Sequence, residues 1–356
     1  MRRLDIILIL TVLLLTSFGL LMIYDASSFV AFRDFADKYH YLKAQLFWAF
    51  AGLTFMTAFS LFDYHKLYNL SLPLMTAAIF LLILVFIPGI GIDLLGAKRW
   101  INLGFMTLQP SEFVKLSLAI YLAAWFSKKE KGRFIAFSLL IGLLLGLVVL
   151  QPDMGTAIVI VGEAMAIYFL SGGNILYFLS SIPVLSAIGL ILIKTSPYRA
   201  ERLATFLNPN QDIQNSSYHV QQILIALGNG GVFGLGLGNS LQKYAYLPEN
   251  TTDSIFAIIA EEFGFVGSTV LICLFAVVVW RGFRIAAKAP DIFGRLLAAG
   301  IITFLGVQMV INLGAQTVLL PLTGIPLPFI SYGGSALIVD LCAIGILLNI
   351  ARQSRS

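Results

Sequence analysis

Long runs of apolar residues, separated by short polar segments, make up most of this chain. A transmembrane helix needs roughly 20 mostly apolar residues, and about ten segments approach that length. They lie near residues 4–24, 44–61, 69–88, 109–126, 133–151, 154–171, 174–194, 254–281, 295–320 and 329–350. The pattern predicts an all-α polytopic membrane protein, with a single integral membrane domain over residues 1–356 and about ten transmembrane helices.

One polar connection, residues 195–253, is much longer than the others and precedes the eighth predicted helix. Connections beyond roughly 12–15 residues usually carry function. Within it, SSYHVQQILIALGNGG has helical spacing but is too short to span a bilayer, which predicts a short surface or re-entrant helix. The glycine-rich GNGGVFGLGLGNSLQK that continues from it lacks the spacing of nucleotide-binding loops. A turn or close helix packing is therefore favoured there.

The charge distribution predicts the orientation of the chain in the membrane. Only 12% of the residues are charged, and the net charge is +5. Basic residues are dense at the chain start, in SKKEKGR, between 281 and 295, and at the chain end. Because short cytoplasmic loops collect Lys and Arg, we expect cytoplasmic N- and C-termini and an extracytoplasmic 195–253 loop. The excess charge thus reports topology, and no nucleic-acid partner is expected.

Two ionisable motifs lie at the outer ends of predicted helices. QPSEFVK places Glu112 and Lys115 three residues apart on one helical face, where they can partly neutralise each other. The alternative is an acidic first turn favoured by the helix dipole. QPDMGTA places Asp153 between two spans, where an ordinary N-cap aspartate is the alternative.

Further charges accumulate on the side predicted to be extracytoplasmic. Lys98 and Arg99 of GAKRWINLG and Lys243 suggest an anionic ligand, although about half of the outer cations are expected to be solvated or to snorkel toward headgroups. Glu249 and Asp253 precede a membrane helix, and an ionisable residue at such a depth is a functional-site hypothesis. The segment PLTGIPLPFISYGGSA holds three prolines and three glycines, so it cannot be a continuous helix and must be buried by protein or line a cavity.

The blocks GAKRWINLG, QPSEFVK, QPDMGTA, GNGGVFGLGLGNSLQK, YLPENTTDSIFAIIAEEFGFVG and PLTGIPLPFISYGGSA occur in this order over nearly the whole chain. Together they resemble the SEDS family (shape, elongation, division and sporulation), the RodA/FtsW-type peptidoglycan glycosyltransferases. The resemblance implies a ten-helix enzyme of cell wall biogenesis that polymerises lipid II at the outer face of the bacterial cytoplasmic (inner) membrane. It does not separate the elongation, division and sporulation subtypes.

The same resemblance assigns residues. The family's catalytic aspartate falls on Asp253, and its helix-four Glu and Lys fall on Glu112 and Lys115. The chain departs from the family at Thr251, where histidine is usual, and at Ser254, where phenylalanine is usual. No role is therefore expected for a histidine beside the aspartate.

The expected chemistry is inverting transfer, with Asp253 as general base and undecaprenyl pyrophosphate as leaving group. Fixed cations would stabilise the leaving group. The residues expected to bind substrate are Lys98, Arg99, Glu112, Lys115, Asp153, Lys243 and Glu249. No dedicated metal site is expected, although a divalent cation such as Mg²⁺ or Mn²⁺ could assist the pyrophosphate.

The expected partners are lipid II, the growing lipid-linked glycan, membrane lipid and a class B penicillin-binding protein that supplies transpeptidation. Two other functions remain open. A lipid-linked oligosaccharide flippase would place its cations along a path through the membrane, and a non-catalytic scaffold for a transpeptidase would not need Asp253.

Overall fold

The computed structural model describes residues 5–94, 97–102, 104, 107–128, 133–209, 217–244 and 247–354. Over these ranges the chain forms twelve helices and one small sheet. The helices are α1 (Ile6–Phe35), α2 (His40–Leu61), α3 (His65–Leu84), α4 (Pro110–Ser127), α5 (Phe134–Leu150), α6 (Met154–Leu170), α7 (Ile175–Lys194), α8 (Pro197–Leu207), α9 (Tyr218–Gly230), α10 (Ile255–Ala287), α11 (Ile292–Gln316) and α12 (Gly334–Gln353).

Each of the ten predicted apolar segments overlaps a helix. Among the described residues, seven helices are long and apolar enough to cross a membrane: α1, α2, α3, α7, α10, α11 and α12. The helices α5 and α6 are apolar but have only 17 residues each. Helix α4 has 18 residues and carries the predicted charged pair. The helical character of the chain is thus confirmed, whereas the count of ten spans stays a prediction.

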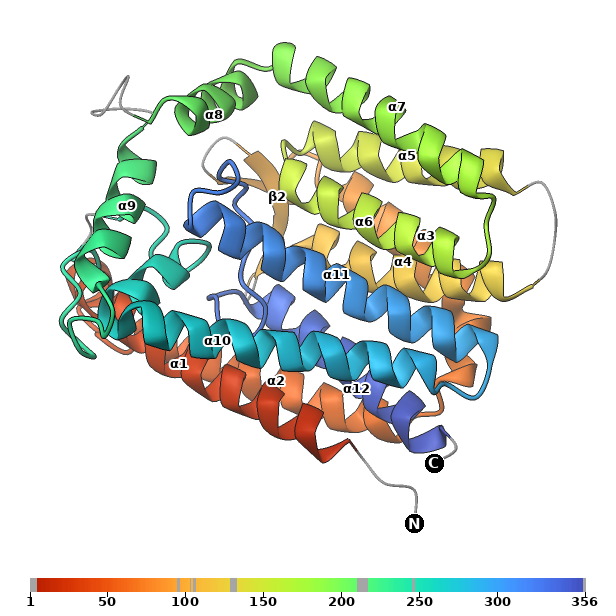
Figure 1. The fold of residues 1–356 in the computed structure, drawn as a ribbon, viewed down its shortest axis with the longest axis horizontal. Coiled ribbons are helices and arrows are strands. Elements are labelled where there is room, and N and C mark those ends of the chain that lie inside the picture. Colours follow the sequence, from red (N-terminus) through yellow and green to blue (C-terminus); the bar gives the residue numbers. More distant parts are fainter. Residues whose placement is uncertain are drawn as a thin grey trace.

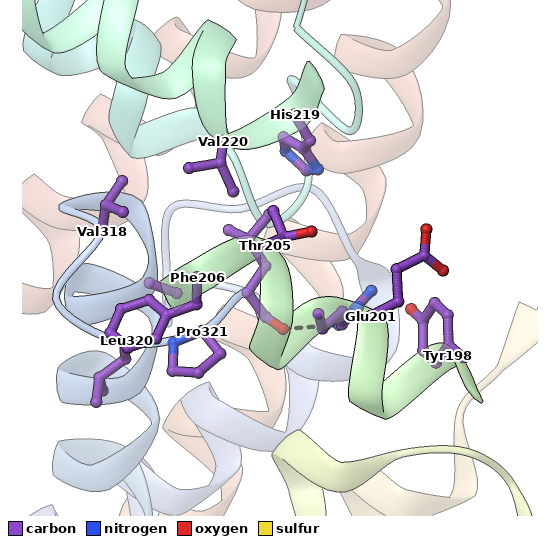
Figure 2. Close-up of a pocket in the computed structure, with 12 residues that line it drawn as sticks. Tyr198, Glu201, Thr205, Phe206, His219, Val220, Val318, Leu320 and Pro321 are labelled. Carbon is purple, nitrogen blue, oxygen red and sulfur yellow. Dashed lines mark hydrogen bonds between the residues drawn. The ribbon is translucent and has the colours of Figure 1, made fainter. Parts of the chain in front are cut away.

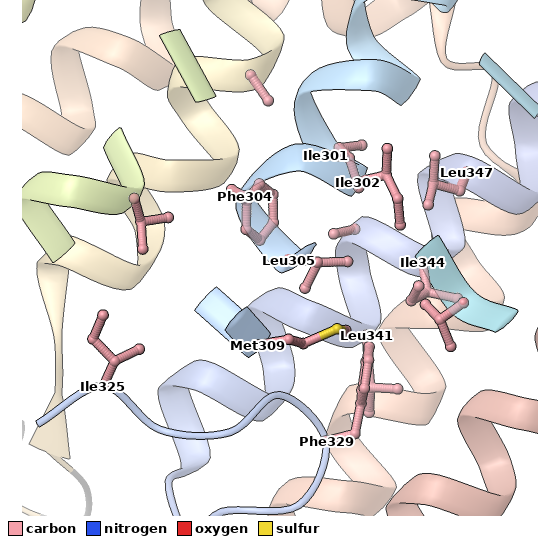
Figure 3. Close-up of a cluster of buried hydrophobic side chains, with 14 of the residues drawn as sticks. Ile301, Ile302, Phe304, Leu305, Met309, Ile325, Phe329, Leu341, Ile344 and Leu347 are labelled. Carbon is pink, nitrogen blue, oxygen red and sulfur yellow. The ribbon is translucent and has the colours of Figure 1, made fainter. Parts of the chain in front are cut away.

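The core lies where α11 and α12 pass between the other helices. In α12, 83% of the most apolar window is buried, and in α11 72%, against none of α7. Figure 3 shows Phe304 and Met309 of α11 beside Leu341 and Ile344 of α12, with Ile325 of the following loop nearby. Because lipid is as apolar as these side chains, close packing rather than exclusion of water holds such helices together.

The two ends of the bundle differ in structure. The start of α1 and the end of α12 lie at one end, whereas α8, α9 and the sheet strand β2 (Ala97–Asn102) lie at the other (Figure 1). The predicted short helix in the 195–253 segment corresponds to α9, and α8 is a second helix that the apolar pattern did not predict. The loops that carry the candidate site residues gather at this second end.

A small antiparallel sheet between α3 and α4 was not predicted. It consists of β1 (Gly91–Leu94), β2 and β3 (Thr107–Leu108), in the order β1-β2-β3. The sequence of β2, AKRWIN, does not alternate between apolar and polar residues, and β1 and β3 have only four and two residues, which explains why the sequence pattern missed them. Successive strand residues point to opposite faces. Accordingly, Lys98 is exposed while Arg99 is half-buried.

Helix α10 is broken at Gly264, whose φ of 65° is a conformation that favours glycine. The break leaves backbone groups without helical partners, and the glycine-rich segment after α9 supplies them. Four backbone hydrogen bonds of 2.9–3.0 Å join the two segments: Leu235 to Glu261, Gly236 to Glu262, Phe265 to Gly231 and Val266 to Val232, the first of each pair donating.

This contact explains the density of glycines. A Cβ on Gly230 would lie 2.1 Å from the carbonyl oxygen of Ala260, and one on Gly234 would lie 2.1 Å from that of Glu262. Such distances exclude any side chain without a backbone shift. The prediction of close helix packing at this segment is confirmed, and the packing fixes the start of α10, where Asp253 lies.

Candidate active site

Asp253 lies in a tight turn immediately before α10. The turn begins at Glu249, which has a φ of 49°, and the Ser254 N–H donates to the Glu249 carbonyl over 3.1 Å. The Thr252 hydroxyl lies 2.8 Å from Glu249 Oε2 and 3.1 Å from Asp253 Oδ1. One hydroxyl therefore contacts both carboxylates. The strained Glu249 backbone is of the kind that clusters at functional sites.

The irregular segment between α11 and α12 forms the opposite side of the turn. A Cβ on Gly324 would lie 3.9 Å from Asp253 Oδ2, so this glycine adjoins the carboxylate. Asn312 of α11 holds the two segments together, because its amide donates to the Asp253 carbonyl over 2.9 Å and to the Ile325 carbonyl over 2.7 Å. The Ser331 hydroxyl donates to the Thr252 carbonyl. As predicted, this irregular backbone is in part buried, at Ile325 and Leu327, and in part lines a cavity, at Pro321 and Leu322.

Two arginines supply positive potential at Asp253. Burial raises the pKa of the Asp253 carboxyl, while the Thr252 hydroxyl and the charges of Arg202 and Arg99 act in the opposite direction. Arg99 donates from Nε to the Gln151 carbonyl over 2.9 Å, and also to the Pro152 carbonyl. Arg99 was predicted from the sequence, whereas Arg202 of α8 was not among the candidate site residues.

Arg202 is fixed by two contacts. Its Nη1 donates to the Leu322 carbonyl over 2.8 Å, and its guanidinium lies 4.5 Å from the centre of the Tyr198 ring. The missed signal was its place in the long 195–253 connection, where an unexplained cation is informative. The side chain could only be brought to Asp253 by the unpredicted helix α8.

Asp153 caps α6. Its carboxylate accepts hydrogen bonds from the Thr156 N–H at 3.1 Å and from the Thr156 hydroxyl at 2.8 Å. The aspartate is buried, with 3% of its surface exposed. Gly155, next in the same turn, packs against Ile325 and the Thr323 carbonyl. Asp153 thus has the capping role weighed from the sequence, in a turn that packs against the loop beside Asp253.

Glu112 and Lys115 form the predicted pair. Lys115 Nζ lies 2.8 Å from Glu112 Oε2, and both side chains are 1% exposed. Lys115 also donates to Gln308 Oε1, and Gln308 in turn donates to the Pro326 carbonyl over 3.0 Å. Through Gln308, the pair therefore supports the irregular loop between α11 and α12. The described contacts of Lys115 do not include Asp253.

Two buried carboxylates near this pair were missed. Both oxygens of Glu163 in α6 and of Asp340 in α12 lack a hydrogen-bond partner among the described residues. The charge of Lys115 acts on both carboxylates. Each lies inside an apolar run, which is the signal that could have identified it.

Lys243 belongs to a different cluster. Its Nζ lies 2.9 Å from Asp25 Oδ1 of α1 and 3.2 Å from Glu262 Oε1 of α10. The neighbouring Glu261 accepts from the Ser240 hydroxyl and from Asn229. These carboxylates hold the glycine-rich segment onto α1 and α10. The structure does not bring Lys243 into contact with Asp253.

Lys98 and Glu249 are the exposed members of the predicted set. Lys98 is the cross-strand partner of Asp93 on β1. Of all the predicted site residues, Glu249, Asp253 and Arg99 share one neighbourhood, and the turn with Asp153 adjoins it. Lys115 and Lys243 are each neutralised elsewhere.

A histidine from α9 contacts the residue that follows the aspartate, although position 251 itself carries a threonine. His219 Nε2 of α9 is 2.7 Å from the Ser254 hydroxyl, directly after Asp253. Burial lowers the pKa of His219 to about 4, with a further contribution from Arg202, whereas Glu249 opposes the shift. The imidazole is therefore neutral at physiological pH. Position 219 was part of the predicted helix, but a helical pattern does not show which residue its histidine will meet.

Comparison with known proteins places this arrangement in a family. The chain matches the family model FTSW_RODA_SPOVE, described as cell cycle protein, over residues 5–356. It is 43% identical to stage V sporulation protein E of Bacillus subtilis, covering 99% of this chain and 98% of that one. It is 41% identical to a probable peptidoglycan glycosyltransferase FtsW of Trichlorobacter lovleyi, covering 98% of this chain and 93% of the relative.

Solved structures agree. A chain of a peptidoglycan synthase complex, described as coordinating polymerization and crosslinking, matches with a TM-score of 0.80 and 28% identity over 98% of each chain. The rod shape determining protein RodA of Thermus thermophilus matches with a TM-score of 0.73 and 26% identity over 99% of this chain and 98% of that one. The resemblance seen in the sequence motifs is confirmed, and this multi-pass membrane protein belongs to the FTSW_RODA_SPOVE, or SEDS, family.

Proposed function

We propose that this chain is a peptidoglycan glycosyltransferase that polymerises lipid II, with Asp253 as the general base. The observation that supports it best is the placement of Asp253. The carboxylate lies at the start of α10, in the potential of Arg99 and Arg202, and at the end of the bundle away from the helix ends that carry the termini. Its relatives include probable peptidoglycan glycosyltransferases.

The reaction joins two lipid-linked sugars. Asp253 accepts the proton of the GlcNAc 4-hydroxyl of one lipid II, and the oxygen attacks the anomeric carbon of MurNAc at the end of the growing chain. The bond to undecaprenyl pyrophosphate breaks with its electron pair, so the anomeric centre inverts. A raised pKa brings a carboxylate closer to the proton affinity that a base needs near neutral pH.

The leaving group needs positive charge on the opposite side of the reacting sugar. Arg99 and Arg202 are the cations whose potential reaches Asp253, and exposed Lys98 extends the basic surface. Lys115 and Lys243 are already paired with carboxylates. We therefore assign leaving-group stabilisation to Arg99 and Lys98 of β2, and to Lys115 and Lys243 the positioning of the loops around the site.

A divalent cation fits one place. No group of three or more His, Cys, Asp or Glu residues that could hold a metal ion occurs in the part of the chain that the structure describes. Mg²⁺ often binds through one or two carboxylates together with substrate phosphates. The exposed carboxylate of Glu249 offers such an oxygen beside the turn and leaves Asp253 free to act as the base. A bound Mg²⁺ or Mn²⁺ would neutralise charge on the pyrophosphate.

The proposed setting follows from the same arrangement. We place the protein in the bacterial cytoplasmic membrane with ten spans, both termini in the cytoplasm, and the Asp253 turn on the extracytoplasmic side. A solved relative belongs to a peptidoglycan synthase complex that coordinates polymerization and crosslinking. On that basis we propose a class B penicillin-binding protein as partner.

Reconstitution in liposomes separates this function from its rivals. Purified protein supplied with external lipid II should form glycan polymer, and Asp253→Asn should not, although it folds. Translocation of lipid II without polymer would support a flippase. A scaffold would be supported if the purified protein forms no polymer in liposomes and cells that carry Asp253→Asn still synthesise their wall normally.

A further inference from the structure

A pocket of about 170 Å³ lies beside the Asp253 turn, and neither the sequence motifs nor the reaction above accounts for it. Figure 2 shows its three walls: α8 with Tyr198, Glu201, Thr205 and Phe206, the start of α9 with His219 and Val220, and the segment after α11 with Val318, Leu320 and Pro321. Arg202 and Leu322 also line it. Two of the walls therefore come from the long 195–253 loop.

Two lining residues connect the pocket to the turn that carries Asp253, although Asp253 itself does not line it. His219 lines the pocket and contacts the Ser254 hydroxyl, one residue after Asp253. Leu322 lines it two residues before Gly324, the glycine beside the Asp253 carboxylate, and its carbonyl accepts from Arg202. A group in the pocket would thus lie next to the turn that carries the proposed base.

The lining selects a type of ligand. Glu201 and Arg202 place one negative and one positive charge on the same wall, so the pocket has no net charge to attract pyrophosphate. The Thr205 hydroxyl and the neutral His219 imidazole add groups that can donate or accept hydrogen bonds. Phe206, Val220 and Leu320 supply apolar surface. Pockets with apolar walls and a few placed polar groups suit a neutral polyhydroxylated ring.

Thr205 gives the strongest single indication. The residue is 7% exposed, and the described residues include no hydrogen-bond partner for its hydroxyl. That hydroxyl is open to the pocket, so it can donate to a ligand or accept from one. The exposed carboxylate of Glu201, one helical turn earlier on α8, likewise has no salt bridge in the described part of the chain.

We propose that this pocket binds the sugar ring of the acceptor substrate, so that its hydroxyl is presented to Asp253. The inference rests on the proposed function and adds to it a binding site for one of the two lipid-linked sugars. The acceptor is the natural occupant because the base must contact the hydroxyl that it deprotonates. The pyrophosphate of the donor then lies toward Arg99, on the side of the sheet.

The test compares binding with turnover in two isosteric variants, Thr205→Val and Glu201→Gln. Binding of lipid II labelled on its peptide is measured in nanodiscs, in an Asp253→Asn background that prevents turnover. We expect the dissociation constant to rise about fivefold for Thr205→Val and about tenfold for Glu201→Gln, because a hydrogen bond to a charged group is the stronger. Turnover is measured in variants that keep Asp253. There, KM should rise while kcat changes less than about twofold.

The matched control is Thr195→Val, an exposed threonine at the end of α7 that does not line the pocket. It should bind and turn over lipid II as the wild type does, and all three variants should share its melting temperature. If Thr205→Val unfolds, the exposed Glu201→Gln still decides the matter. Unchanged binding by a folded pocket variant would overturn the pocket assignment while the wild type still polymerises. Failure of the wild type itself to polymerise would overturn the proposed function.

Discussion

Replacing Lys115 by methionine should destabilise the protein strongly, because Lys115 neutralises a carboxylate within the helix bundle. Both Lys115 and Glu112 are 1% exposed, and 2.8 Å separates their charged atoms. The variant would leave Glu112 without its cation and Gln308 without the ammonium that donates to it. Breaking a buried ion pair in this way typically costs about 3–5 kcal/mol.

The lower end of that range, about 3 kcal/mol, is the better expectation for this chain. In the unfolded state that detergent produces, α4 stays helical, and a pair three residues apart on one helix can still form there. Part of the pair's stabilisation is therefore present in both states and cancels. The remaining cost comes from the lost hydrogen bond between Lys115 and Gln308, and from leaving Glu112 unpaired in an enclosed environment.

The assay is unfolding by sodium dodecyl sulfate in mixed micelles, followed by tryptophan fluorescence. Lys115→Met should lower the free energy of unfolding by about 3 kcal/mol. Adding Glu112→Gln to it should recover part of that loss, because it removes the carboxylate that has lost its partner, whereas Glu163 and Asp340 still lack the charge of Lys115. A loss below about 0.5 kcal/mol for Lys115→Met, or strictly additive effects in the double variant, would refute the reasoning.

Three further predictions concern the supports of the site. Gly264→Ala should abolish polymerisation and loosen the start of α10, seen as faster hydrogen exchange there, because the added Cβ would lie 2.3 Å from the Gly234 nitrogen. Lys243→Met should cost about 3 kcal/mol in the same unfolding assay, since it strands the two carboxylates that it contacts. The pKa of His219 is about 4 in the folded protein and 6.5 in the unfolded chain, so the unfolded chain takes up the proton first as the pH falls. The wild type should therefore lose stability progressively between pH 6.5 and about 4. The His219→Gln variant should therefore lose less stability than the wild type between those two pH values.

The sequence predicted the helices well because length and apolar content decide whether a segment can span a bilayer. Helix α8 escaped prediction because the sequence pattern marks only one short helix, at residues 218–230, in the long polar connection. The strand that carries Arg99 escaped because its six residues, AKRWIN, do not alternate between apolar and polar, and its neighbouring strands are shorter still. Gly264 was read as part of a continuous helix, since a single glycine in an apolar run rarely marks a break.

The candidate site was predicted in part. Asp253, Glu249 and Arg99 are neighbours, as an outer anionic site would require. The pairing of Lys115 with Glu112 was predicted from their spacing. The sequence could not show the carboxylate partners of Lys243, because Asp25 and Glu262 are far from each other in the chain. Arg202 and His219 were missed for the same reason. Their role depends on how α8 and α9 fold back over the Asp253 turn.

The most direct test of the central claim is the pH dependence of glycosidic bond formation by the wild type and Asp253→Asn, with Glu249→Gln as a comparison. Because burial raises the pKa of Asp253, the acidic limb of kcat/KM for the wild type should lie above the ordinary value of 3.8. Asp253→Asn should lose about 100-fold or more in rate and the acidic limb with it. Polymerisation by folded Asp253→Asn at the wild-type rate, with the same acidic limb, would contradict the assignment of Asp253 as the base.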